Sequence, residues 1–182
     1  MIGNRLLASS VAVVSALSAV ATASPFSAGV SIGRAQSADD SDNTDPNTTW
    51  GLWGRMRVAG LFSTQLELYK YDNVDGAAMG SLHGVAIVDL RRHGHLIPIA
   101  LAGVGYEWTN GQQSGFDVAA GVGLEYRTDG GFIVGLDARL GTRSVSSPDE
   151  PLGCNECLYA AAPTDFRNGE YRAVRLAVGM HF

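Results

Sequence analysis

The sequence has little of what defines several protein classes. Only two of its 182 residues are cysteine, which excludes a small scaffold held together by many disulfides. Its 13 Lys+Arg stand against 18 Asp+Glu, and this net charge of -5 argues against a nucleic-acid partner. Charged residues make up 17% of the chain, too few for a disordered protein. What remains is a chain with 46% hydrophobic residues and 23 glycines, whose length fits one domain.

Residues 1–23 have the three-part layout of a secretory signal peptide. Arg5 supplies a positive charge, residues 6–20 are apolar or small, and Ala21-Thr22-Ala23 offers the small residues of a cleavage site. A membrane anchor is the alternative, although the run is shorter than the roughly 20 residues of a spanning helix. We predict that residues 1–23 are removed on export and that residues 24–182 form one mature domain.

Apolar residues in the mature chain recur at every second position, which is the period of a β-strand. In residues 116–127 one parity is apolar, from Phe116 to Tyr126, and the other holds Gly, Ala and charged residues. Turn signals such as Thr128-Asp129-Gly130-Gly131 separate such runs. The pattern predicts eight strands, near residues 26–35, 49–60, 62–72, 79–90, 96–108, 115–127, 131–144 and 170–182. Most of them reach the roughly 9–11 residues with which a tilted strand crosses a bilayer.

Long and short connections alternate between these strands. Long loops are expected near residues 36–48, 73–78, 109–114 and 145–169, and short turns near 61, 91–95 and 128–130. Long loops on one side and tight turns on the other are typical of an outer-membrane barrel. The predicted fold is therefore all-β, an eight-stranded antiparallel up-and-down transmembrane β-barrel with both termini on the short-turn side.

The parity opposite to the apolar one predicts a crowded polar lumen. It carries Gly, Ala and Ser with isolated charges, whereas a solvated face would be rich in Lys and Glu. The inward charges are six arginines and six carboxylates: Arg55, Arg57, Arg127, Arg139, Arg143, Arg175, Glu67, Asp89, Glu107, Asp117, Glu125 and Asp137. Since eight strands enclose room for side chains and not for an aqueous pore, we expect a closed, charge-paired interior. Ile99 and Leu101 share the parity of Glu107, which requires a bulge or a locally apolar lumen.

Aromatic residues gather toward the ends of the predicted strands. Trp50, Trp53, Tyr71, Trp108, Phe116 and Tyr171 lie toward the long loops, and Phe26, Phe62, Tyr126, Phe132 and Phe182 toward the short turns. Two such groups are expected where rings meet lipid headgroups. The alternative is that aromatic residues favour strand ends in any β protein.

The last strand carries the most specific pattern. The chain ends on Phe182, and the residues that share its parity are Val174, Leu176, Val178 and Met180. This ending resembles the C-terminal signature that outer-membrane barrels present to their assembly machinery. In pattern, nearly the whole mature chain resembles the eight-stranded barrel superfamily that includes the OmpA transmembrane domain and the OmpX and Ail proteins. The resemblance implies a monomer in the cell outer membrane, in contact with its lipid and inserted through the last strand.

Some barrels of this kind modify lipid A, so catalytic residues were sought. The deacylase type would pair a histidine with a serine two residues on, and none of the four histidines has one. His93 and His95 fall in a short turn and His181 at the short-turn end, on the wrong side for the outer leaflet. His83 is expected to point inward as a polar lumen residue. We therefore predict no enzyme, no catalytic residue, no cofactor and no metal site.

The exterior loops hold the remaining candidates. Cys154 and Cys157 are expected to form a disulfide, with a zinc site or a redox pair as alternatives. Residues 39–45 are acidic and are expected to be a solvated loop; calcium binding is the alternative. The 145–169 loop is long enough to contact a partner, whose identity the sequence does not give.

These observations predict a small outer-membrane barrel with a structural or adhesin-like role through its exterior loops. A soluble lipocalin-like barrel with an apolar ligand is the main alternative, but it needs an apolar lumen. A lipid-modifying enzyme and a narrow channel are further alternatives.

Overall fold

A computed structural model describes residues 25–37, 47–72, 79–91, 93–109, 113–146 and 169–182. Within them lie eight strands and no helix long and apolar enough to span a membrane. The strands are β1 (Phe26–Ser37), β2 (Asn47–Ala59), β3 (Phe62–Asp72), β4 (Met79–Asp89), β5 (Leu96–Thr109), β6 (Gln113–Arg127), β7 (Phe132–Ser146) and β8 (Gly169–His181). The eight predicted strands are thus confirmed with small shifts at their ends. Residues 1–23, the predicted signal peptide, lie outside the described part.

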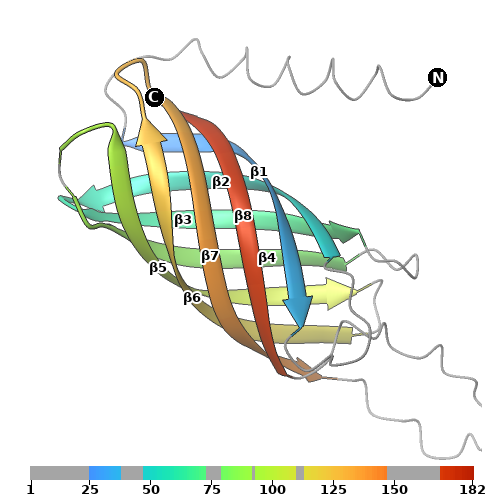
Figure 1. The fold of residues 1–182 in the computed structure, drawn as a ribbon. Helices are drawn as coiled ribbons and strands as arrows, with labels where there is room; N and C mark the ends of the chain where they lie inside the picture. The colour runs from blue at the N-terminus through green and yellow to red at the C-terminus, as the bar shows by residue number, and fades with distance from the viewer. Residues whose placement is uncertain (1–24, 38–46, 73–78, 92, 110–112, 147–168) are drawn as a thin grey trace, which may run out of the picture.

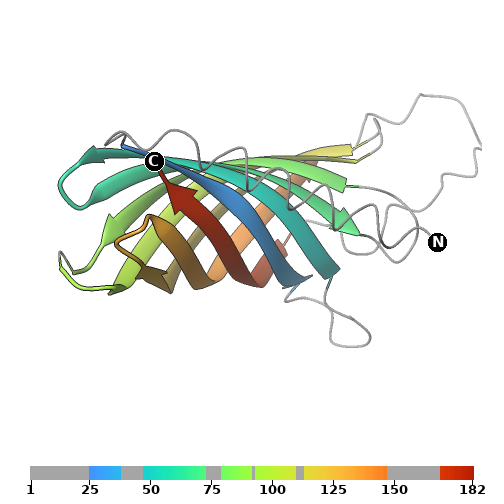
Figure 2. The ribbon, with the colours of Figure 1, turned by 90° about the horizontal axis from the view of Figure 1, so that it is seen from above.

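The eight strands form one closed antiparallel barrel (Figures 1 and 2). Each strand pairs with its neighbour in sequence, and β1 closes the ring by pairing with β8 from Ser27↔His181 to Ser37↔Tyr171. Closure leaves no strand edge with unpaired backbone groups, which removes the usual risk of edge-to-edge association. The predicted all-β up-and-down architecture is confirmed.

The short turns, the start of β1 and the end of β8 lie together at one end of the barrel, as predicted (Figure 1). The backbone N–H of Phe182 donates to the carbonyl oxygen of Phe26 at 2.9 Å, which ties the last residue to the first strand. Gly60 and Gly131 have φ angles of 54° and 82°, and only glycine adopts this region at little cost. We call this side the turn end of the barrel and the opposite side the loop end.

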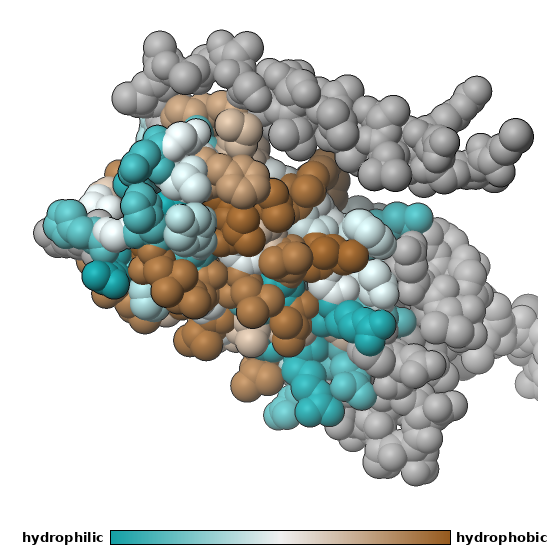
Figure 3. Space-filling model, turned by 45° about the horizontal axis from the view of Figure 1, so that its top comes forward, coloured by the Kyte–Doolittle hydropathy of each residue, from teal (hydrophilic) through white to brown (hydrophobic). Residues whose placement is uncertain are grey.

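Side chains alternate between a polar interior and an apolar exterior. Leu140 on the outer wall is 71% exposed, while Glu67 inside is 0% exposed. Figure 3 shows hydrophobic side chains spread across the visible barrel wall and hydrophilic ones toward the ends. This is the reverse of a soluble protein, in which apolar side chains fill the core and charges face water.

One part of the lumen is apolar. Val85 and Ile87 of β4 pack inside the barrel with Ile97, Ile99 and Leu101 of β5. The pairing of β5 with both neighbours runs without interruption through this segment. Of the two explanations that the sequence left open, a locally apolar lumen is therefore correct and a bulge is not needed.

The predicted aromatic groups are wrong for three residues. Trp53, Tyr71 and Tyr171 point into the lumen and are buried. The reason is parity, because Trp53 lies two residues from Arg55 on the same face of its strand. Space for the Trp53 ring comes from Gly29, where an added Cβ would lie 2.7 Å from the ring atom Cζ2. The outward aromatic residues are Phe26, Trp50, Phe62, Tyr106, Trp108, Phe116, Tyr126 and Phe132.

Candidate functional site: the charged lumen

The structure places ten of the twelve predicted inward charges in the buried interior. Arg127 is partly buried and still joins the network. Arg57 faces the buried Asp89 at 3.6 Å but is not itself buried, since its side chain is 48% exposed. Arg57 lies next to the turn, and the register of β2 shifts directly after it, between Arg57 and Ala59. Arg57 therefore sits at the mouth of the turn end.

The turn end of the lumen holds a cluster of saturated ion pairs. Arg55 donates to both carboxylate oxygens of Glu125, at 2.8 and 2.5 Å, and to Gln65 at 2.8 Å. Arg127 donates to both oxygens of Asp89, at 2.7 and 2.8 Å, and also to Glu125. Such two-pronged bonds between a guanidinium and a carboxylate are the strongest and most directional of ion pairs.

The middle of the lumen is organised around Glu67. Arg139 donates to both oxygens of this carboxylate, at 2.7 and 2.8 Å, and Arg175 donates to one of them at 2.6 Å. The Tyr69 hydroxyl adds a bond of 2.6 Å. Asp137 lies between the same two arginines and accepts from Arg139 at 2.8 Å and from Arg175 at 2.6 Å. All four charges are thus fixed by several partners.

These bonds cross the barrel from wall to wall. Arg55 stands on β2 and Glu125 on β6, four strands apart in a ring of eight. The same separation divides Arg139 on β7 from Glu67 on β3. Polar side chains therefore span the lumen from one wall to the opposite one at these two levels.

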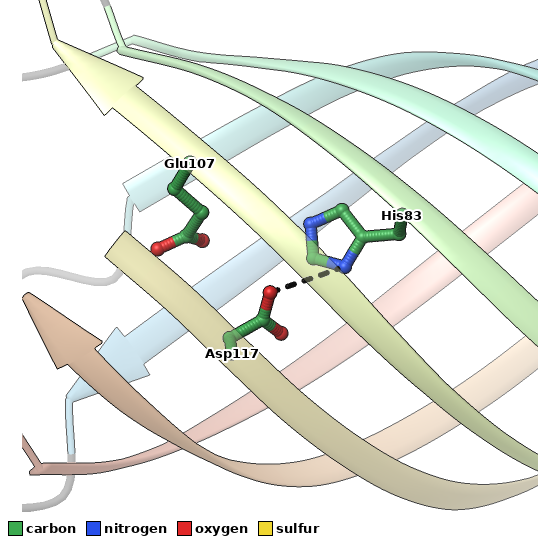
Figure 4. Close-up of side chains that lie close together, drawn as sticks. All are labelled: His83, Glu107 and Asp117. Carbon is green, nitrogen blue, oxygen red and sulfur yellow. Dashed lines mark ion pairs between the residues drawn. The ribbon is translucent and has the colours of Figure 1, made fainter. Parts of the chain in front are cut away.

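The loop end of the lumen is built differently. His83 on β4, Glu107 on β5 and Asp117 on β6 are all buried and lie close together (Figure 4). His83 Nδ1 is 3.5 Å from Asp117 Oδ1, and the Tyr171 hydroxyl donates to the other Asp117 oxygen at 2.5 Å. Among the described residues, Arg143 is the arginine paired with this group, through Glu107.

Sequence parity missed several polar members of the network. Gln65, Tyr69 and Tyr71 alternate with Glu67 along β3 and have its inward parity, and all three contact charged groups. Their signal was present in the sequence but was overlooked because they carry no charge. One serine–histidine contact is present at the turn end, where Ser27 Oγ lies 2.9 Å from His181 Nδ1.

The remaining predicted site residues divide into described and undescribed ones. Cys154 and Cys157 lie outside the described residues. The acidic segment 39–45 and most of the 145–169 loop lie outside them as well. Val174 and Leu176 of the predicted assembly signature point outward and are exposed on β8, while Val178, Met180 and Phe182 are half-buried.

The fold is that of a closed eight-stranded antiparallel β-barrel with an apolar outer wall and charged residues in its lumen. The chain is similar in fold to Neisserial surface protein A, with a TM-score of 0.61, 13% identity, and coverage of 86% of this chain and 96% of that one. It is also similar to the N-terminal β-barrel domain of Pseudomonas aeruginosa OprF, with a TM-score of 0.51, 18% identity, and coverage of 86% and 97%. No protein-family model and no curated protein sequence matches the chain. Both solved structures are eight-stranded outer-membrane barrels, so the predicted resemblance is confirmed at the level of the fold.

Proposed function

We propose that the chain is an integral outer-membrane barrel whose closed lumen makes it a rigid base for its exterior loops. The observation that carries this proposal is the reversed sidedness of the barrel. Large apolar residues such as Leu140, Phe116 and Val122 are exposed on the wall, while the charges are buried inside. An apolar wall of this extent needs a cover, and lipid hydrocarbon supplies it along every strand.

The proposal assigns a structural or interaction role, not transport or catalysis. Ion pairs that join opposite walls, such as Arg55 to Glu125, support a lumen that is plugged. The lipocalin-like alternative would need an apolar ligand cavity, whereas the larger described cavity, of about 170 Å³, is lined by Arg55, Arg57 and Arg127 among others. The interaction surface is assigned to the loop end, above all to residues 145–169 and an exterior partner.

Cell fractionation tests the membrane placement. We expect the protein in the outer-membrane fraction, as a monomer whose gel mobility changes on boiling because the closed barrel resists detergent. Recovery in the soluble fraction, with one mobility before and after boiling, would overturn the proposal.

The role of the loops needs a separate test. Replacing residues 147–168 with a short Gly-Ser turn should leave the boiling-dependent mobility unchanged and abolish binding of the cells to host matrix or to other cells. The matched control shortens the turn near residues 91–95 on the opposite side. Equal binding by the loop variant and the parent would exclude this loop as the interaction surface.

A further inference from the structure

We propose that His83, Glu107 and Asp117 bind one divalent transition-metal ion at the loop end of the lumen. The three side chains come from adjacent strands β4, β5 and β6 and converge inside the barrel (Figure 4). One ligand atom from each lies within 4.8 Å of the others. This inference goes beyond the proposed structural role and does not depend on where the barrel is located.

The distances suit a small ion. A tetrahedral zinc ion with bonds of about 2.1 Å holds its ligand atoms about 3.4 Å apart. His83 Nδ1 and Asp117 Oδ1 are separated by 3.5 Å, close to that spacing. The ligand atom of Glu107, whose carboxylate Arg143 and Tyr71 hold in place, lies within 4.8 Å of the other two.

Polar atoms of all three residues are among the buried ones in the described part of the chain that lack a hydrogen bond, together with atoms of Ser31, Asn47, Ser81 and Arg143. Within the described residues, His83 Nε2, Asp117 Oδ1 and Glu107 Oε2 have no hydrogen-bond partner, although Glu107 Oε2 forms an ion pair with Arg143. The His83 side chain is only 7% exposed, so bulk water does not compensate for the missing bonds. Leaving a buried polar atom unpaired is unfavourable, and a bound ion would give Asp117 Oδ1 a partner.

A glycine leaves room for the convergence. Gly105 stands between His83 and Asp117 in the register, paired with both across β4–β5 and β5–β6. A Cβ at this position would overlap Asp117 Oδ1 and lie 2.5 Å from His83 Nδ1. The two side chains meet only because β5 has no side chain at this level.

The local charge also favours a cation. Glu107 and Asp117 bring two negative charges, and Arg143 is the one described arginine paired with them. The Tyr171 hydroxyl holds the second oxygen of Asp117, which turns Oδ1 toward His83. Hydrogen bonds of this kind orient metal ligands from the second layer of contacts.

The donor set narrows the choice of metal. One imidazole and two carboxylates suit Zn²⁺ and neighbouring divalent ions, whereas Ca²⁺ takes six to eight oxygen ligands and Cu(I) prefers sulfur. A cavity of about 40 Å³ beside His83 and Tyr71 has room for water, which would complete the coordination.

Equilibrium dialysis against ZnCl₂ tests the site. The full barrel is purified in detergent without an affinity tag and with Cys154→Ser and Cys157→Ser, so that the other candidate ligands are absent. We expect one zinc ion per chain, and an affinity lower by more than about tenfold in His83→Gln and in Asp117→Asn. The matched control is His181→Gln, since His181 lies at the turn end beside Ser27 and should not matter.

Two results would overturn the proposal: no zinc above background in the parent, or equal binding by the parent and the His83→Gln variant. If a variant does not fold, as judged by its circular dichroism, X-ray absorption of zinc bound to the parent decides. One imidazole with oxygen ligands supports the site, and a spectrum without imidazole refutes it.

Discussion

The two ends of the lumen use similar residues in opposite ways. At the turn end, the guanidinium groups of Arg55 and Arg127 and the carboxylates of Glu125 and Asp89 saturate one another. At the loop end, Glu107 and Asp117 share one arginine and a histidine, and polar atoms remain unpaired within the described residues. The charged groups of the turn end thus have their partners within the protein. The loop end retains buried polar atoms that a bound cation could engage.

The total charge of the lumen conceals this difference. The middle level balances Arg139 and Arg175 against Glu67 and Asp137. The turn end has one arginine in excess, because Arg55, Arg57 and Arg127 face two carboxylates. The loop end has one carboxylate in excess, so six charges of each sign cancel overall but not locally. A cation at the loop end would restore the balance there.

The largest effect is expected where the network is most saturated. Glu67→Gln removes the carboxylate that pairs with Arg139 and Arg175, and it leaves two buried guanidinium groups short of partners. We expect the free energy of unfolding to fall by about 3–5 kcal/mol in urea titrations of the detergent-solubilised barrel. The exposed Glu170→Gln serves as the control, with a change within about 0.5 kcal/mol. A loss no larger than the control would show that the middle level does not stabilise the barrel.

Zinc should stabilise the barrel through the loop end alone. At a free concentration one hundred times its dissociation constant, a ligand raises the free energy of unfolding by about 2.7 kcal/mol. The same titration with His83→Gln should show no increase, because the imidazole ligand is gone. Magnesium at equal concentration is the control ion. An equal gain in the parent and the variant would place the zinc elsewhere.

Filling the gap between His83 and Asp117 should lower the stability of the barrel by less than Glu67→Gln does, and it should abolish zinc binding. Gly105→Ala forces the two side chains apart, and overpacking of this kind costs about 1–3 kcal/mol. Gly84→Ala is a matched control, since an added Cβ there meets nothing within 4 Å. We expect zinc binding to be lost in the first variant and kept in the second, as measured by dialysis. Retained binding in Gly105→Ala would show that the gap is not needed.

The sequence predicted which side of the wall a residue faces better than it predicted which partner the residue meets. Alternation placed Glu67 and Arg139 inside, but their pairing across the barrel depends on the tilt and stagger of the strands, which parity does not contain. The meeting of His83 with Asp117 depends on two hairpin registers at once. For Trp53, aromatic character predicts a place at the membrane surface, whereas its shared parity with Arg55 puts it inside the barrel.

The smallest effect is expected at Arg57, which is the most exposed of the twelve predicted lumen charges. Its side chain is about half exposed, and its contact with Asp89 is long at 3.6 Å. Ion pairs of this exposed kind contribute less than about 1 kcal/mol, so Arg57→Gln should barely change the urea midpoint. Arg55→Gln, two residues away on the same strand, breaks a buried two-pronged pair with Glu125 and should cost several times more. Equal losses of stability in the two variants would mean that the ion pair of Arg57 contributes as much as the buried pair of Arg55. The boundary between the ion-paired lumen and solvent would then lie beyond Arg57.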